Sequence, residues 1–324
     1  MNNLDLKQKE FPGLRIGVSS CLLGEKVRYN STHVRDVFLL ETLGHHVEWV
    51  PVCPEVENGK GTPREAVRLV GIDQKISMVA PKSGIDYTEE MQNWTGSKIK
   101  DLLDIHGYVL MKNSPSCGLF RVKVYDKNSI PTRSGRGVFA KGLTDALPLL
   151  PVEENGRLHD HRLRENFIER IFAYKRWQLL INEPAKPSDL VAFHTSFKCT
   201  LMAHHPNAQT ELGRIVARSG SQDFGNTLDE YGKKFMSFMS IVATPKTHTN
   251  VLHHLMGFLK NYLDSNDKVE LLSVIEDYRV GEVPLVVPIT LLKHHFSRNP
   301  LPDWVKVQVY LNPYPKELSL RNYV

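Results

Sequence analysis

The chain has 324 residues, a length that favours two domains over a single hydrophobic core. Its 41% hydrophobic and 24% charged residues are ordinary for a globular protein, and a net charge of +5 is only a weak signal for a polyanionic partner. No run approaches the roughly 18 apolar residues of a transmembrane helix. The polar start MNNLDLKQKEF lacks the apolar core of a secretory signal, so we expect a cytoplasmic protein with no membrane partner.

The first part of the chain alternates short apolar runs with helical patterns. Strands are predicted at 15–18, 46–52, 77–80 and 107–111, and helices at 32–43, 89–106 and 137–147. Such alternation is typical of a largely parallel sheet with crossover helices, which predicts a Rossmann-like α/β domain. The stretch 126–137, DKNSIPTRSGRG, is predicted to be a flexible basic loop.

From residue 158 onwards the pattern is helical. Helices are predicted at 161–182, 187–205, 207–219, 224–242, 246–263, 265–278 and 288–296. No alternating strand pattern separates them, so this part is predicted to be an all-α domain. The stretch 149–156 combines Pro, acids and Gly and marks a junction, which divides the chain into domains 1–152 and 153–324. The Pro- and Tyr-rich stretch 301–324 is predicted to wrap the surface.

Three of the four cysteines, Cys21, Cys53 and Cys117, come just after predicted strands. If these strands are parallel neighbours, the three sulfurs meet at one edge of the sheet. Three thiolates in a reducing compartment point to zinc or an iron–sulfur cluster, and a missing fourth ligand leaves a position open for substrate or water. The alternative is three unrelated buried cysteines.

Other side chains near these cysteines are candidates for catalysis. Glu55, two residues after Cys53, is a natural general acid or base beside a metal-bound substrate, although an exposed acidic loop residue is as plausible. Ser114 precedes Cys117 by three positions, but a serine in a Ser-Pro-Ser turn usually bonds the local backbone. Arg28, Arg64 and Lys112 flank the cysteine segments and could hold an anion, although each alone is more often an ordinary ion-pair partner.

Histidines in the second part occur as adjacent pairs at 204–205, 253–254 and 294–295. Adjacent residues on a helix face different directions, so we interpret these pairs as polar or interface histidines rather than metal ligands. Cys199 lies on an apolar helix face and is predicted to be in the core.

Longer segments of the chain resemble known families. Residues 15–150 resemble the TudS-type thiouracil desulfidases, through VSSCLLGEKVRY, VPVCPEVE with GTPRE, and LMKNSPSCG in this order. Residues from 158 onwards resemble the YbgA-type helical domain, through RLRENFIERIFAYKRW, FHTSFKCTLMAHHP and YLNPYPKELSLRN. The combination resembles the RudS-type desulfidases, a likeness that implies removal of sulfur from 4-thiouridine in tRNA and a tRNA-binding role for the helical domain.

The resemblance also implies a site. It places a [4Fe-4S] cluster on Cys21, Cys53 and Cys117, with one open iron that binds the thiocarbonyl sulfur. It makes Glu55 the acid/base residue and gives Ser114 a catalytic role. The substrate-binding residues are then expected to be Ser20, Arg28, Arg64 and Lys112. Asn30-Ser31 stands where many relatives carry Asp-Gly.

Two alternative functions stay open at this point. The first is the same chemistry on free 2-thiouracil or thiouridine, with the helical domain serving oligomerisation. The second is a non-catalytic protein that binds RNA or a partner, although the joint presence of the three cysteines and Glu55 speaks against it.

Overall fold

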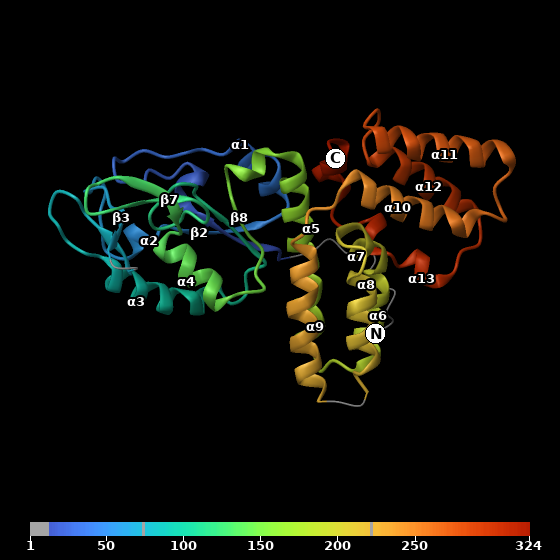
Figure 1. Ribbon diagram of the computed structural model, residues 1–324, viewed down its shortest axis with the longest axis horizontal. Coiled ribbons are helices and arrows are strands. Elements are labelled where there is room, and N and C mark those ends of the chain that lie inside the picture. Colours follow the sequence, from blue (N-terminus) through green and yellow to red (C-terminus); the bar gives the residue numbers. More distant parts are fainter. Residues whose placement is uncertain (1–12, 73–74, 221–222) are drawn as a thin grey trace. The chain divides into compact units, whose positions relative to one another are not determined.

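The computed structural model describes residues 13–72, 75–220 and 223–324 (Figure 1). These residues divide into two compact units, 13–159 and 160–324. The sequence places the boundary after residue 152, whereas the structural division follows His159. The reason is that the expected junction contains a strand, Val152–Glu154, which pairs with the sheet of the first unit.

The first unit is built on a four-stranded parallel sheet in the order β2-β1-β5-β8. Its strands are β1 (Arg15–Ser19), β2 (Glu48–Val52), β5 (Gly107–Leu110) and β8 (Val152–Glu154). Tyr108, Val109 and Leu110, successive residues of β5 that point to alternate faces, are fully buried, as expected for a strand covered on both faces. The predicted α/β class with a largely parallel sheet is confirmed.

Four helices belong to this unit: α1 (Val37–Glu41), α2 (Pro54–Glu57), α3 (Thr88–Lys98) and α4 (Val138–Ala146). Helices α3 and α4 lie side by side (Figure 1). They approach closely at Gly142, where an added Cβ would lie 2.7 Å from a methyl group of Thr95. The helix expected over 32–43 is reduced to α1 and a 3₁₀ turn (η2, Leu43–His45), and α3 ends in another (η3, Ile99–Leu102).

A second sheet, in the order β4-β3-β6-β7, corrects the prediction of a flexible loop over 126–137. Its strands are β3 (Arg68–Ile72), β4 (Lys75–Val79), β6 (Val122–Tyr125) and β7 (Pro131–Gly135). Strand β7 pairs antiparallel with β6, so backbone hydrogen bonds order this segment. Four of its five residues are exposed, and the sequence therefore shows no apolar alternation there.

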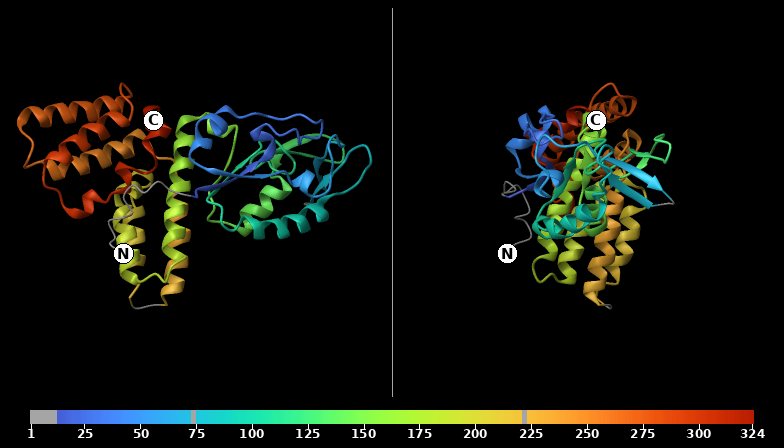
Figure 2. Two further views of the ribbon diagram at one scale, coloured as in Figure 1. Left: turned by 180° about the vertical axis from the view of Figure 1, so that it is seen from behind. Right: turned by 90° about the vertical axis from the view of Figure 1, so that its left-hand side faces the viewer.

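The second unit is all-α, as predicted. Its main helices are α5 (His161–Ile181), α6 (Pro187–Ser196), α7 (Lys198–His204), α8 (Ala208–Ala217), α9 (Phe224–Met239), α10 (Pro245–Met256), α11 (Ser265–Val280) and α12 (Val286–Arg298). The long helices α5 and α9 pack against each other (Figures 1 and 2). Within the parts of the chain that are described, no helix has the length and apolar character needed to cross a bilayer.

The segment after residue 301 is a correction to the expectation that it wraps the surface. It forms α13 (Asp303–Lys306) and three 3₁₀ turns, η6 (Val309–Leu311), η7 (Lys316–Leu318) and η8 (Leu320–Asn322). Tyr310, Tyr314 and Arg321 of this segment are buried. Tyrosines can occupy a core when their hydroxyl groups find partners there, as these do.

Candidate functional site

The order of the parallel sheet brings three cysteine-bearing segments to one edge. Cys21 lies in the 3₁₀ turn η1 (Ser20–Leu23) directly after β1, and Cys53 follows β2. Cys117 lies in the loop after β5. Because β2, β1 and β5 are adjacent and parallel, their carboxyl ends meet at the same edge, where open α/β sheets bind ligands.

Burial and mutual repulsion disfavour the ionised form of these thiols. All three are free cysteines, and Cys21 and Cys117 are buried. Burial raises the pKa of Cys21 to about 11, and the charge of a Cys53 thiolate acts in the same direction. Burial likewise raises the pKa of Cys117 well above its usual range, with further contributions from Glu55, Cys21 and Cys53. Three thiols that oppose one another's ionisation call for a cation to hold them as thiolates.

The loop before Cys117 is held by the first turn of α4. The amide N–H of Val138 donates to the carbonyl of Pro115, and that of Ala140 donates to the carbonyl of Ser116. Gly137 makes this approach possible, since an added Cβ would lie 2.4 Å from the carbonyl oxygen of Ser116. The position of Cys117 is thus fixed by backbone hydrogen bonds to a helix.

Glu55, in α2, has both carboxylate oxygens engaged. Its Oε2 is paired with the guanidinium of Arg64, and its Oε1 accepts a hydrogen bond of 2.5 Å from the hydroxyl of Ser116. Arg64 also donates to the carbonyl of Val27, which lies 3.8 Å from the Cys53 sulfur. Both partners of the ion pair are largely buried, with side-chain exposures of 10% for Arg64 and 15% for Glu55. Glu55 is therefore an oriented carboxylate beside the cysteines, not an exposed loop residue.

Ser114 has a local backbone role. Its hydroxyl oxygen accepts hydrogen bonds from the amide N–H of Ser116 at 3.2 Å and of Cys117 at 3.0 Å. The nearby Ser116, which the sequence analysis did not select, is fully buried and contacts Glu55 instead. The same Ser-Pro-Ser-Cys motif contains both serines, so the sequence carried the signal but gave no means to choose between them.

The other expected substrate-binding residues occupy different settings. Ser20 is buried in η1. Arg28 lies close enough to Cys21 for its charge to lower the pKa of that thiol, against the larger effect of burial. Lys112 is exposed, and its aliphatic stem lies along Gly156. Arg64, in contrast, is occupied by Glu55.

Tyr108 is a residue near the cysteines that the sequence analysis missed. Its ring is fully buried, lies against Gly17 and packs edge-on to Phe139 with centroids 5.6 Å apart. Burial raises the pKa of the Tyr108 hydroxyl well above its usual range, and charges on Cys117, Glu57, Cys53 and Cys21 act in the same direction. This hydroxyl has no hydrogen-bond partner among the residues described.

The side chains at this edge are of the kind that hold an iron–sulfur cluster, because cysteine thiolates are its usual protein ligands. Within residues 13–72, 75–220 and 223–324, no three His, Cys, Asp or Glu side chains are grouped to bind one ion. In a cluster each cysteine bonds a different iron, so the thiols need not share one coordination sphere. The Tyr108 hydroxyl is buried without a partner among the described residues, and sulfur acceptors of a cluster held by the three cysteines would offer it one.

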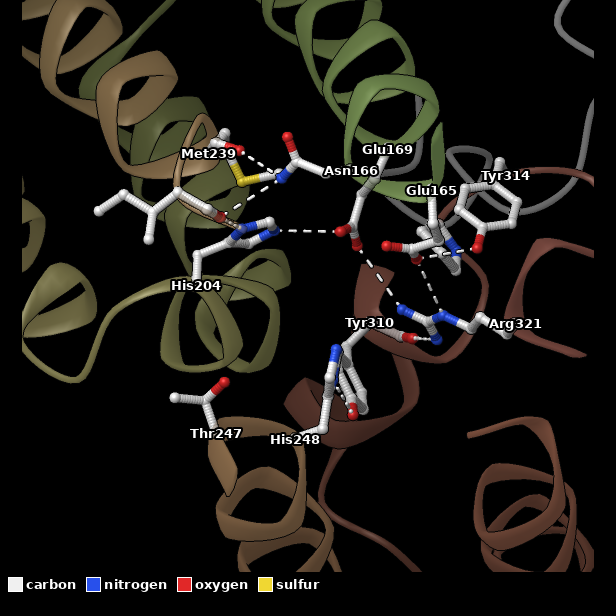
Figure 3. Close-up of polar contacts among 12 residues, drawn as sticks. Glu165, Asn166, Glu169, His204, Met239, Thr247, His248, Tyr310, Tyr314 and Arg321 are labelled. Carbon is white, nitrogen blue, oxygen red and sulfur yellow. Dashed lines mark hydrogen bonds and ion pairs between the residues drawn. The ribbon is translucent and has the colours of Figure 1, made fainter. Parts of the chain in front are cut away.

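His204 of the helical unit belongs to a buried charge network (Figure 3). His204 contacts the carbonyl of Ile241 through Nδ1 and, at 3.0 Å, the carboxylate of Glu169 through Nε2. Burial lowers the pKa of His204, but the hydrogen bond and charge of Glu169 outweigh this effect and raise it. Since both ring nitrogens face acceptors, His204 is an imidazolium.

Arg321 completes this network. Its guanidinium is paired with Glu165 at 3.4 Å and with Glu169 at 3.6 Å, and Glu165 accepts a hydrogen bond of 2.9 Å from the hydroxyl of Tyr314 (Figure 3). Two carboxylates and two cations are thus buried together. Cys199 is fully buried nearby in the same unit, which confirms its predicted place in the core.

Two different protein families match the chain, one in each of the two compact units. Residues 16–155 match the family described as 2-thiouracil desulfurase, and residues 198–315 match the family of unknown function DUF1722. The uncharacterized protein YbgA of Escherichia coli (strain K12) is 29% identical over 162 residues, which cover 50% of this chain and 95% of YbgA.

Two further relatives match the first unit. The uncharacterized protein YbbK of Bacillus subtilis (strain 168) is 31% identical over 137 residues, which cover 40% of this chain and 86% of YbbK. The solved structure of the [4Fe-4S]-dependent thiouracil desulfidase TudS is 28% identical, covers 45% of this chain and 93% of its own, and has a TM-score of 0.36. The chain belongs to the 2-thiouracil desulfurase family and combines this domain with a YbgA-like DUF1722 domain.

Proposed function

We propose that this protein is a [4Fe-4S]-dependent desulfidase that removes sulfur from 4-thiouridine in tRNA. The observation that carries the proposal is the meeting of Cys21, Cys53 and Cys117 at the carboxyl ends of three adjacent parallel strands, with the oriented carboxylate of Glu55 beside them. Membership of the 2-thiouracil desulfurase family supports the same chemistry.

Three thiolates would hold the cluster: Cys21, Cys53 and Cys117. Held by three protein ligands, such a cluster would supply Lewis-acid chemistry for the thiocarbonyl sulfur. The overall reaction replaces C=S by C=O: water supplies the oxygen, and the sulfur leaves as hydrogen sulfide. No net electron transfer is required.

The protein's own residues supply the proton chemistry. Glu55 accepts a proton from the attacking water through its carboxylate, which Arg64 and Ser116 keep in a fixed orientation. Ser114 orients the backbone next to Cys117 through its two accepted hydrogen bonds. In RNA, the thiolated base would be turned out of its stack to reach this edge of the sheet.

The helical unit is proposed to bind the tRNA. The support for this role is indirect: the unit is a separate compact body with its own core, and the desulfurase match ends before it begins. A helical unit that served only oligomerisation would leave the enzyme with no preference for tRNA over free thiouracil.

The test is anaerobic reconstitution of the full-length protein with iron and sulfide, followed by sulfide-release assays on thiolated tRNA and on free thiobases. The proposal expects a coloured protein that releases sulfide from tRNA faster than from the free base. A colourless protein without sulfide release would overturn the desulfidase assignment. Equal turnover of tRNA and free base would overturn the tRNA-binding role.

A further inference from the structure

We propose that a basic pocket on the second sheet binds a phosphate group of the substrate. The pocket has a volume of about 310 Å³ and lies between strands β3, β6 and β7 and the loop that leads to Cys117. Its polar lining is cationic and aromatic, and it includes Arg68, Lys123, Tyr125 and Arg133. The inference rests on the proposed function, because that function supplies a nucleotide as the ligand.

The strand register places the three cations in one row. Lys123 of β6 is directly paired with Arg133 of β7. Strand β3 runs parallel to β6, and Leu69 is paired with Val124. When this register is extended by one residue towards the start of both strands, Arg68 lies beside Lys123. Like charges at directly opposed positions destabilise a sheet. This row therefore has a cost to the fold that a bound anion would remove.

No carboxylate of the described chain compensates these charges. Arg68, Lys123 and Arg133 form no ion pair in the described residues, and none of the residues that line the pocket is acidic. Lys123 and Arg133 are exposed and extend from the solvent face of the sheet, whose other face buries Val122 and Val124. The pocket thus concentrates positive charge in a concave site.

Arg68 is held ready for an anion. Its guanidinium lies over the ring of Tyr125 at 4.8 Å and donates to the hydroxyl of Ser129 at 3.3 Å. Its Nε is buried and has no partner among the residues described, which is costly for a charged donor. A planar guanidinium that is held by an aromatic ring and a neutral hydroxyl, with no carboxylate partner in the described residues, matches the oxygens of a phosphate.

The pocket adjoins the cysteine site. Asn113 and Pro115 line it, and they belong to the same short loop as Ser114 and Cys117. Asn113 adopts a left-handed conformation with φ of 61°, which turns the chain between the pocket and the cysteine. A phosphate in the pocket would therefore belong to the nucleotide whose base reaches the cysteines, or to its neighbour in an RNA strand.

The test is a binding titration of the full-length protein with sulfur-free probes, which measure recognition without turnover. Uridine 5′-monophosphate should bind at least about tenfold more tightly than uridine, because charge-assisted hydrogen bonds to phosphate are strong. Lys123→Gln and Arg133→Gln should each weaken binding of the monophosphate about tenfold. With an oligouridylate, each should reduce the slope of log affinity against log salt by about one.

Lys100→Gln is the matched control, because Lys100 is an exposed lysine of the same unit that lies outside the pocket. Equal binding of uridine and its monophosphate would overturn the pocket, and so would a Lys123→Gln variant that behaves like Lys100→Gln. Thermal unfolding of each variant verifies that it is folded. Because the substituted side chains are exposed, we expect the glutamine variants to fold.

The same probes identify the source of the phosphate. Tighter binding of the oligouridylate than of the monophosphate would assign the pocket to an RNA backbone, and equal or weaker binding would assign it to a mononucleotide; either result supports a phosphate site. Sulfide release without any phosphate preference would overturn the pocket and leave the desulfidase intact. A phosphate preference without sulfide release would retain the pocket and reject the enzyme.

Discussion

In the helical unit the buried charges of Glu165, Glu169, His204 and Arg321 are paired with groups of opposite charge, whereas at the cysteine edge of the first unit the thiols oppose one another's ionisation. There the Tyr108 hydroxyl is also buried without a partner in the described residues. Like charges that are brought together without a counter-charge are costly, whereas opposite charges that are buried together offset part of that cost. The comparison supports a stabilising role for the helical network and agrees with the proposal that the cysteine edge holds a cofactor.

The largest expected effect comes from removing one of the opposed thiols. Cys21→Ala should abolish the iron content and visible absorbance of the reconstituted protein, because three thiolates are the whole protein ligand set of the proposed cluster. Cys199→Ala is the control, since Cys199 is buried in the helical core and away from the proposed ligands. Retention of wild-type iron content and absorbance by Cys21→Ala would refute the three-cysteine assignment.

The helical network should respond strongly to loss of one charge. Glu169→Ala leaves His204 and Arg321 buried without one of their carboxylates, and removing one partner of a buried pair typically costs about 3–5 kcal/mol. The free energy of unfolding from urea denaturation, followed by the helical circular dichroism signal, measures this loss. Glu276→Ala removes an exposed carboxylate paired with Arg279 and should have no measurable effect. Equal stability of the two variants would contradict a stabilising role for the network.

The pH dependence of the free energy of unfolding tests whether buried His248 is neutral in the folded helical unit. Burial lowers the pKa of His248 to about 3, and the charge of Arg321 acts in the same direction. The folded state therefore disfavours the proton. The stability that His248 contributes is fully present above its unfolded pKa of about 6.5 and is lost as pH falls from there towards 3, at roughly 1.4 kcal/mol per pH unit.

His248→Gln should reduce the steepness of this acid-side loss, measured as the free energy of unfolding at several pH values between 6.5 and 4. His253→Gln is the control, because His253 is exposed on the same helix. An unchanged slope in His248→Gln would show that this histidine is already able to ionise in the folded protein.

The smallest expected effect is at Tyr108. Without cofactor, Tyr108→Phe should leave the free energy of unfolding unchanged to within about 1 kcal/mol or raise it slightly, because the hydroxyl that is removed has no partner. After reconstitution, the reduction potential of the cluster should shift, since hydrogen bonds to its sulfurs help to set it. A clear loss of stability in the apo protein would show that the hydroxyl already has a partner there.

Much of the first sheet could be predicted because its strands are continuous apolar runs that end on distinctive residues. The meeting of the three cysteine segments was conditional on their strands being parallel neighbours, and the structure has the order β2-β1-β5. The pairing of Glu55 with Arg64 and Ser116 could not be predicted, because it depends on how the loops that carry Arg64 and Ser116 approach helix α2. The order of residues along the chain says little about such contacts.

The second sheet and the segment after residue 301 show a different limit. Strand β7 carries Pro, Thr, Arg, Ser and Gly, which read as a loop, and it is ordered only by its pairing with β6. Likewise, prolines and tyrosines after 301 suggest surface chain, yet Tyr310 and Tyr314 are buried because His248 and Glu165 supply partners from distant helices. Tertiary contacts override local propensity in both cases.

The link between Arg321 and Glu165 has a consequence for the order of events during synthesis. These two residues are separated by 156 positions along the chain. At roughly 5–20 residues per second, a ribosome takes about 8–30 s to make the chain between them. Throughout that interval α5 carries two carboxylates whose arginine does not yet exist. The core around them can therefore close only after residue 321 has left the ribosome, so α5 cannot complete its packing while it is being made.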